Sequence, residues 1–151
     1  MRFTPSKINA FLLFRLPAAF LCGVRVDSLD PDSCTACVTH RWINQNPFRS
    51  MYFAVQAMAA ELTTGLLLIR EIRESAADVS ILIVGSRATF VKKATGKITF
   101  RCKDADAARE VVQEAITSND SREITMRSVG YNADGEVVSE MEFQWKIKLR
   151  K

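Results

Sequence analysis

Residues 51–72 have the sequence MYFAVQAMAAELTTGLLLIREI, and this stretch decides the fold. The run is long and apolar enough to suggest a membrane span, but Gln56, Glu61, Thr63 and Thr64 would each be unfavourable in lipid. A helix that is hydrophobic on all sides must be covered on all sides. We therefore expect a buried central helix, with a strongly curved sheet wrapped around it.

The rest of the chain alternates between helices and pairs of strands. Residues 8–15 have helical spacing and predict an extra N-terminal helix, and residues 104–118 predict an amphipathic one. The last strand is the clearest, with alternate residues 141–149 facing inward and Lys146 and Lys148 facing outward. The pattern predicts a single α+β domain over residues 1–151, with an antiparallel sheet of about six strands.

Three finer expectations concern the neighbours of the central helix. Ser50 is a typical N-cap residue, so we expect it to cap a helix that starts near Met51. Residues 80–91 are apolar on both faces, which predicts a central strand covered on both sides. Ala94–Lys97 is a turn, so we expect the strands around it to form a middle hairpin.

Composition excludes several classes of protein. The 151 residues are 48% hydrophobic with 6 Gly and 4 Pro, which excludes a disordered or collagen-like chain. A single His, His40, excludes a multi-His metal centre within one chain. The net charge of +4 is mild, and without a dense Lys/Arg block we expect no nucleic-acid partner.

Cysteines and the N-terminus bear on the compartment. Cys34 and Cys37 have the CxxC spacing but lie in a strand-like segment, where side chains three apart point to opposite faces. We therefore expect free thiols in a reducing cytoplasm and no metal site. The apolar run near the N-terminus is interrupted by Arg15 and Pro17 and is too short to span a bilayer.

Glu61 is the residue most suited to chemistry. It is the only charged residue between Arg49 and Arg70, and it falls in the middle of the apolar helix. A buried carboxylate must be paired or have a raised pKa, and such groups are often functional. The alternative is a structural Glu that forms hydrogen bonds with Thr64 or a nearby loop.

The start of the central helix adds a second element. Backbone N–H groups at a helix N-terminus are free and lie at the positive end of the dipole, so the amides of Met51, Tyr52 and Phe53 could hold an oxyanion. Asn46 offers a side-chain amide nearby. This arrangement favours acyl transfer or hydrolysis, in which Glu61 acts as base or nucleophile.

These residues carry a resemblance to a known family. The run N-x-N-P-F-x-S-M-Y-F-A over residues 44–54, A-E-L-T-T-G over 60–65 and F-x-W-x-I-K over 143–148 resemble the hotdog-fold thioesterase superfamily. The chain is most similar to an uncharacterised bacterial branch of it, and the similarity covers nearly the whole sequence. The resemblance implies a hotdog fold, a homodimer or a dimer of dimers, and sites for acyl-CoA between subunits.

The resemblance also implies roles for individual residues. In thioesterases of the phenylacetate-pathway type, the central-helix acid is the base or nucleophile, and Glu61 stands at that position. Asn46 matches an Asn that orients water or substrate, and Ser80 matches an assisting Ser or Thr. Phe53 and Tyr52 stand where that family has Gly and His, so the pocket must differ.

The resulting hypothesis is a cytoplasmic hydrolase of acyl-CoA or of an acyl-carrier thioester, with no cofactor other than the CoA moiety of the substrate. Alternatives are a non-catalytic module that binds acyl or other hydrophobic ligands, and a dehydratase, although His40 lies outside the position such enzymes use. The residues assigned to substrate binding are Phe48, Thr64, Arg87, Lys92 and Lys93.

Overall fold

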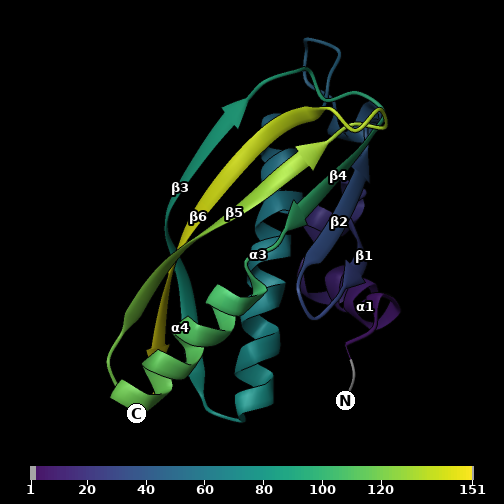
Figure 1. Cartoon of the computed structure of the whole chain (residues 1–151). Coiled ribbons are helices and arrows are strands. Elements are labelled where there is room, and N and C mark those ends of the chain that lie inside the picture. Colours follow the sequence, from purple (N-terminus) through teal and green to yellow (C-terminus); the bar gives the residue numbers. More distant parts are fainter. Residues whose placement is uncertain (1–2, 151) are drawn as a thin grey trace.

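The computed structural model describes residues 3–150, which form one six-stranded antiparallel sheet with helices (Figure 1). The strand order is β1-β2-β4-β5-β6-β3. The elements in chain order are α1 (Pro5–Arg15), α2 (Pro17–Leu21), β1 (Arg25–Leu29), β2 (Cys34–Thr39), the short 3₁₀ helix η1 (Trp42–Asn44), α3 (Phe53–Ser75), β3 (Val79–Phe90), β4 (Lys97–Cys102), α4 (Ala105–Ser118), β5 (Arg122–Tyr131) and β6 (Val137–Leu149).

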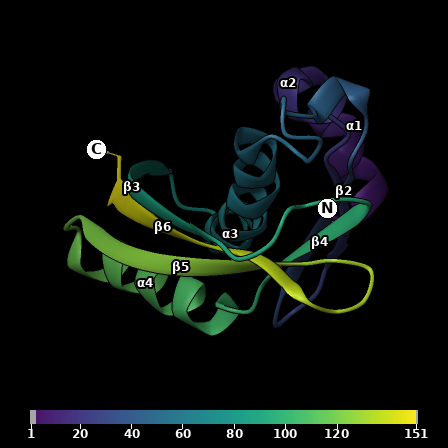
Figure 2. The same cartoon turned by 90° about the horizontal axis from the view of Figure 1, so that it is seen from above.

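The sheet curves around α3, so the predicted architecture is confirmed. Figure 2 shows α3 in the hollow of the sheet, with α1 and α2 beside its β1–β2 end. Helix α3 packs on β1, β2, β4, β5 and β6, and α4 packs against α3, β5 and β6. Thirteen of the 23 residues of α3 are buried. It is the one helix of the described residues that is long and apolar enough to cross a membrane, and 67% of its most apolar window is buried inside the protein.

Three buried polar pairs fix α3 on the sheet. Thr63 Oγ1 lies 2.8 Å from Ser128 Oγ on β5. Ser139 Oγ donates to Gln56 Oε1 at 2.9 Å, and Trp145 Nε1 donates to Thr64 Oγ1 at 3.0 Å. A helix with apolar residues all round could rotate or slide in an apolar hollow. These directional bonds select one position, because leaving a buried polar group unpaired is unfavourable.

The strand pattern holds for the last hairpin. β5 and β6 pair across the turn at residues 132–136, and Met141, Phe143, Trp145 and Ile147 are buried while Lys146 and Lys148 are exposed. Helix α4 begins at Ala105, one residue after the predicted start, because Asp104 occupies the N-cap position.

The strand at residues 80–91 was predicted to be central, and this is wrong. β3 lies at the edge of the sheet, hydrogen-bonded to β6 alone. Its inward residues Ile81 and Ile83 pack on the core, but Leu82 and Val84 are 64% and 43% exposed. Apolar residues on both faces indicate burial of both faces, but the pattern does not say whether the covering surface belongs to the same chain.

The prediction of a middle hairpin is also wrong. β3 and β4 do not pair, since β4 lies between β2 and β5. Residues 91–96 are therefore a crossover between distant strands. The basic residues expected to flank that hairpin are therefore separated: Arg87 lies on β3, Lys97 on β4, and Lys92 and Lys93 in the crossover between them.

The start of the central helix differs from expectation. Helix α3 begins at Phe53, and its N-cap is Tyr52 with no side-chain cap, because the Ser50 side chain bonds to Asn46 instead. The predicted N-terminal helix is confirmed as α1, which ends at Arg15 as expected; Leu16 then leaves the helical conformation (φ −133°), and Pro17 starts α2, which was not predicted. Proline disfavours helical backbone at the residue before it, which explains the break.

Candidate active site

Glu61 lies on the side of α3 that the sheet leaves partly open. Its neighbours on that face, Ala54, Ala57 and Met58, are only partly buried. Among the described residues, no side chain forms a hydrogen bond or an ion pair with the Glu61 carboxylate. Burial raises the pKa of this carboxyl above its ordinary value of 4.5. The group is therefore unpaired, partly desolvated and still reachable from solvent.

The Glu61 carboxylate lies next to Gly65, one turn further along α3. Glu61 Oε1 lies 3.4 Å from the point where a Cβ on Gly65 would sit, and the Trp145 ring lies at the same distance from that point. Glycine thus leaves room for both side chains. A larger residue at this position would displace either the acid or the indole.

Thr64 does not bind the carboxylate. Its hydroxyl donates to the Glu61 backbone carbonyl at 2.8 Å and accepts from Trp145 Nε1. Thr64 is fully buried. It fixes the helix turn that carries Glu61, and it does not reach a surface where a substrate could bind.

The Asn46 side chain organises the loop before α3. Its oxygen accepts from the backbone N–H of Phe48 at 2.9 Å and of Ser50 at 3.2 Å. Its nitrogen lies 3.1 Å from Ser50 Oγ and 3.3 Å from the Met51 carbonyl oxygen. Both ends of the amide already have partners within the loop.

Of the three amides assigned to an oxyanion site, two are occupied. The Met51 N–H donates to the Ala94 carbonyl and the Tyr52 N–H to the Asn44 carbonyl, each at 2.8 Å. The Phe53 N–H, at the first position of α3, has no acceptor among the described residues. Because it lies at the positive end of the helix dipole, it is the amide that remains able to stabilise an anion.

A cavity of about 570 Å³ opens at this end of α3. It brings together Asn46, Phe48, Met51, Tyr52, Phe53, Lys92 and Lys93, all singled out from the sequence. The Phe53 ring packs edge-to-face on Tyr52 and on Phe90, with centroid distances of 4.9 and 6.3 Å.

The cations of this cavity differ in their partners. Lys92 pairs with Glu136 at 2.5 Å, so its charge is neutralised. Lys93 donates only to the neutral Phe48 carbonyl, at 3.1 Å. Phe90 and Val91 also line the cavity, and no local sequence signal indicates this, because only the pairing of β3 with β6 carries the end of β3 to the start of α3.

The other predicted site residues lie elsewhere. Ser80 pairs with Lys148 on the sheet face turned away from α3 and donates to the Lys148 carbonyl. Arg87 lies on that same outer face and forms an ion pair with Glu142 at 2.8 Å. Glu61 follows Phe53 by eight residues, or about 12 Å along the helix axis. One chain therefore does not bring its own Glu61 and its free Phe53 amide to one carbonyl group.

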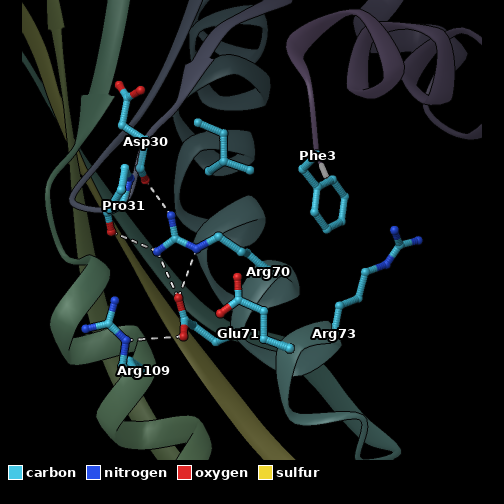
Figure 3. A pocket seen from close by; sticks show the side chains of 9 residues that line it. Phe3, Asp30, Pro31, Arg70, Glu71, Arg73 and Arg109 are labelled. Atoms are coloured by element: carbon cyan, nitrogen blue, oxygen red, sulfur yellow. Dashed lines mark hydrogen bonds and ion pairs between the residues drawn. The ribbon is translucent and has the colours of Figure 1, made fainter. Parts of the chain in front are cut away.

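Another cavity, of about 910 Å³, is near the opposite end of α3 (Figure 3). Arg70 donates to the backbone carbonyls of Asp30 and Pro31 and to Glu71, which also pairs with Arg109 of α4 at 3.5 Å. The lining has as many acidic as basic side chains, and Arg70 is hydrogen-bonded to fixed acceptors. The arrangement joins α3, the β1–β2 turn and α4, and it is structural.

Known structures share this fold. A protein of unknown function from Pseudomonas aeruginosa, described as a probable thioesterase, is 22% identical with a TM-score of 0.82 and 97% coverage of both chains. A thioesterase from Haemophilus influenzae is 11% identical (TM-score 0.73, covering 99% of this chain and 93% of that chain). A mutant thioesterase from Pseudomonas aeruginosa is 13% identical (TM-score 0.74, 99% and 97%).

The predicted hotdog fold is thus confirmed. A comparison with curated protein sequences finds no significant match. The model of a family described as a domain of unknown function, DUF4442, matches residues 6–147. Since this match spans nearly the whole chain, the protein belongs to the DUF4442 family.

Proposed function

We propose that this protein is an acyl-thioester hydrolase, active on acyl-CoA or on an acyl group held by a carrier protein in the cytoplasm. One observation carries the proposal. In the apolar part of the central helix of this hotdog fold, the Glu61 carboxylate has no partner among the described residues, and its pKa is raised. A structural Glu at this position would be paired. An unpaired, desolvated acid is suited to accept a proton from water or to attack a carbonyl carbon.

In the proposed reaction, the ionised Glu61 removes a proton from a water molecule while the oxygen of that water attacks the thioester carbonyl carbon. The Phe53 N–H stabilises the oxyanion of the tetrahedral intermediate. When the carbon–sulfur bond breaks, Glu61 returns the proton to the thiolate, and a carboxylic acid and a free thiol are the products. In the covalent variant, the Glu61 carboxylate attacks the carbonyl carbon, the carbon–sulfur bond breaks and the thiolate leaves; water then hydrolyses the resulting anhydride to the carboxylic acid and regenerates Glu61, and the proton released protonates the thiolate.

The site is proposed to form between two copies of the chain. Within one chain, Phe53 and Glu61 are separated by about 12 Å along α3. A partner copy would place its helix start beside Glu61 of the first. The aromatic cavity with Phe48 and Phe90 would then receive the acyl group or the pantetheine arm, and Lys93 would lie near its mouth to meet phosphate.

The test is hydrolysis of a panel of acyl-CoAs by Glu61→Gln, with Glu74→Gln as a matched control. Glu74 is an exposed acid on the same helix. General acid–base catalysis contributes about 10²–10⁴-fold, so Glu61→Gln should lose that much of kcat while Glu74→Gln keeps the wild-type rate. Equal rates for wild type and Glu61→Gln, with both folded by circular dichroism, would refute the mechanism.

A second candidate is a non-catalytic module that binds acyl or other hydrophobic ligands. The observation in its favour is that Asn46 and the amides of Met51 and Tyr52 already have partners within the chain. Calorimetric binding of acyl-CoA without turnover of any thioester would favour this function. Turnover that depends on Glu61 would exclude it.

A further inference from the structure

Helix α1 has apolar residues on both its inner and its outer face. Ile8 and Leu12 are 2% and 0% exposed and belong to the core, whereas Phe14 is 79% exposed and Leu13 is 43% exposed. A helix of a soluble protein normally presents polar residues on its outer side, and one that is apolar on both sides is normally covered on both sides. Here no part of residues 3–150 covers the outer side.

This apolar surface extends beyond α1. Leu21 at the end of α2 is 64% exposed, and Trp42 and Ile43 of η1 are 84% and 52% exposed. The two parts are joined by the Asn44 side chain, which donates to the Cys22 carbonyl at 2.9 Å. Figure 2 shows α1 and α2 grouped beside the sheet rather than against its β3 edge. We name this surface the N-terminal face; its residues are Leu13, Phe14, Leu16, Leu21, Trp42 and Ile43.

The two segments that carry this face contain cations and no acids. The sequence has no Asp or Glu in residues 1–26 or 38–60, although it has 17 elsewhere. Every cation in an ion pair of the described residues lies at position 70 or later. Among residues 3–150, the cations of the two acid-free segments form no ion pair. These cations are Lys7, Arg15, Arg25, Arg41 and Arg49.

Two of these arginines lie close together. The Arg25 guanidinium lies 3.5 Å above the Phe20 ring, and burial together with the positive charge of Arg41 lowers the pKa of Arg25. Arg41 itself is exposed and precedes Trp42. Two like charges held close together repel each other, and an anionic partner would relieve this repulsion.

We propose that the N-terminal face binds the surface of an anionic lipid bilayer. Leu, Phe and Trp side chains would enter the boundary between headgroups and acyl chains, and Arg and Lys would remain with the phosphates. Two copies of this face are an unsuitable pair, because the segments that carry it contain cations and no acids, so like charges would meet. The inference is independent of the proposed hydrolase activity, since no residue of the face belongs to the candidate active site.

The test measures binding of the full chain to vesicles of phosphatidylcholine alone and of phosphatidylcholine with phosphatidylglycerol. We expect co-flotation with the anionic vesicles, weakening as salt is raised, and little with the neutral ones. The two tryptophans report the orientation, because Trp42 is 84% and Trp145 5% exposed. Trp42 fluorescence should shift to the blue and be quenched by brominated lipid, and Trp42→Phe should abolish both changes.

Variants distinguish binding through this face from non-specific adsorption to vesicles. Phe14→Ser should weaken vesicle binding roughly tenfold, as expected for an aromatic side chain that no longer enters the interface. Arg15→Gln should weaken it about fivefold. The matched controls are Leu82→Ser on the β3 edge and Lys148→Gln on the outer sheet face, and both should bind like wild type. All four side chains are exposed, so folding is preserved.

Two results would overturn the proposal. One is the absence of wild-type binding to anionic vesicles. The other is a change in sedimentation coefficient of Phe14→Ser without lipid, which would assign the face to a protein contact. Neither result would bear on hydrolysis, which is measured separately on soluble acyl-CoA.

Discussion

At the scale of single residues, Glu61 is the feature on which the proposed function depends. It has a raised pKa because burial penalises its charged form, and no cation compensates for this among the described residues. Ionisation at neutral pH therefore opposes folding. An acid that weakens the fold and has no partner is typical of an active site, where stability is exchanged for reactivity.

The sign of the pH dependence follows from linkage. Because the folded-state pKa lies above the unfolded one, the stabilising contribution of Glu61 is fully present below pH about 4 and is lost as pH rises through the raised pKa. Glu61→Gln stays neutral throughout. We expect the variant to be more stable than wild type at pH 7, with the difference vanishing near pH 4, as measured by urea unfolding. A constant difference across this range would contradict the assignment.

The pH profile of activity should match. If Glu61 acts as the base, the acidic limb of kcat/KM reports its pKa in the free enzyme and lies above 4.5. A limb at or below the ordinary value would show that another group is titrating.

The sequence pattern singles out Glu61 as a buried acid, but it does not show which hydrogen bonds the residues at the start of α3 form. Glu61 stands out because one charge in an apolar helix is visible in the sequence. The occupied amides of Met51 and Tyr52 were not predictable, because their acceptors, Ala94 and Asn44, reach them only through tertiary packing. The same is true of the loop bonds that engage Asn46.

At the scale of secondary-structure elements, the pairing of β4 with β5 depends on one glycine. Gly130 lies directly opposite Phe100, and a Cβ at position 130 would lie 2.6 Å from the Phe100 ring. The fully buried ring occupies the space that a side chain would fill. We expect Gly130→Ala to destabilise the fold by about 1–3 kcal/mol in denaturant unfolding. Combining it with Phe100→Leu should recover part of that loss; strictly additive effects would show that the two positions do not clash.

The join between α3, α4 and the β1–β2 turn depends on Glu71. It is buried and pairs with both Arg70 and Arg109. Glu71→Ala leaves the buried Arg70 charge without its acid, so we expect a loss of about 3–5 kcal/mol of unfolding free energy. The exposed pair of Arg87 and Glu142 provides the control, and Glu142→Ala should change stability by less than about 1 kcal/mol. Equal losses would mean that the Glu71 pairs are no stronger than a surface contact.

The element order was predictable because alternation and turn residues are local signals. The final strand shows this most clearly, since its period of two is uninterrupted from Met141 to Leu149. The place of β3 was not predictable, because its pairing with β6 joins residues far apart in sequence. Its apolar composition was interpreted as burial within one chain.

At the scale of the whole molecule, β3 leaves the sheet with a long, open edge. The 12-residue strand pairs with β6 on one side, and among the described residues no strand pairs with its other side, which also carries exposed Leu82 and Val84. Natural proteins seldom leave such an edge uncovered. A second copy that pairs along β3 would cover it and supply the two-chain site proposed above.

The homodimer is tested at this edge. Val84→Pro adds a residue without a backbone N–H at the bulge of β3 and should convert the dimer to monomer in sedimentation equilibrium. Hydrolysis should fall with it. Leu13→Ser, an exposed apolar change on the N-terminal face, is the control and should leave the dimer intact. A monomeric wild-type protein with full activity would refute both the dimer and the shared site.

The three polar pairs that hold α3 also bear on how the chain folds. They join residues 56–64 to residues 128–145, with sequence separations of 65, 83 and 81. Contacts of such high contact order form slowly, because a long loop must close before any of them stabilises the chain. During synthesis α3 leaves the ribosome well before β5 and β6, so its apolar surface has no sheet to enter until translation is almost complete. Newly made chains should therefore depend on chaperones through most of synthesis, and aggregation should be greatest in truncated chains that end before residue 122.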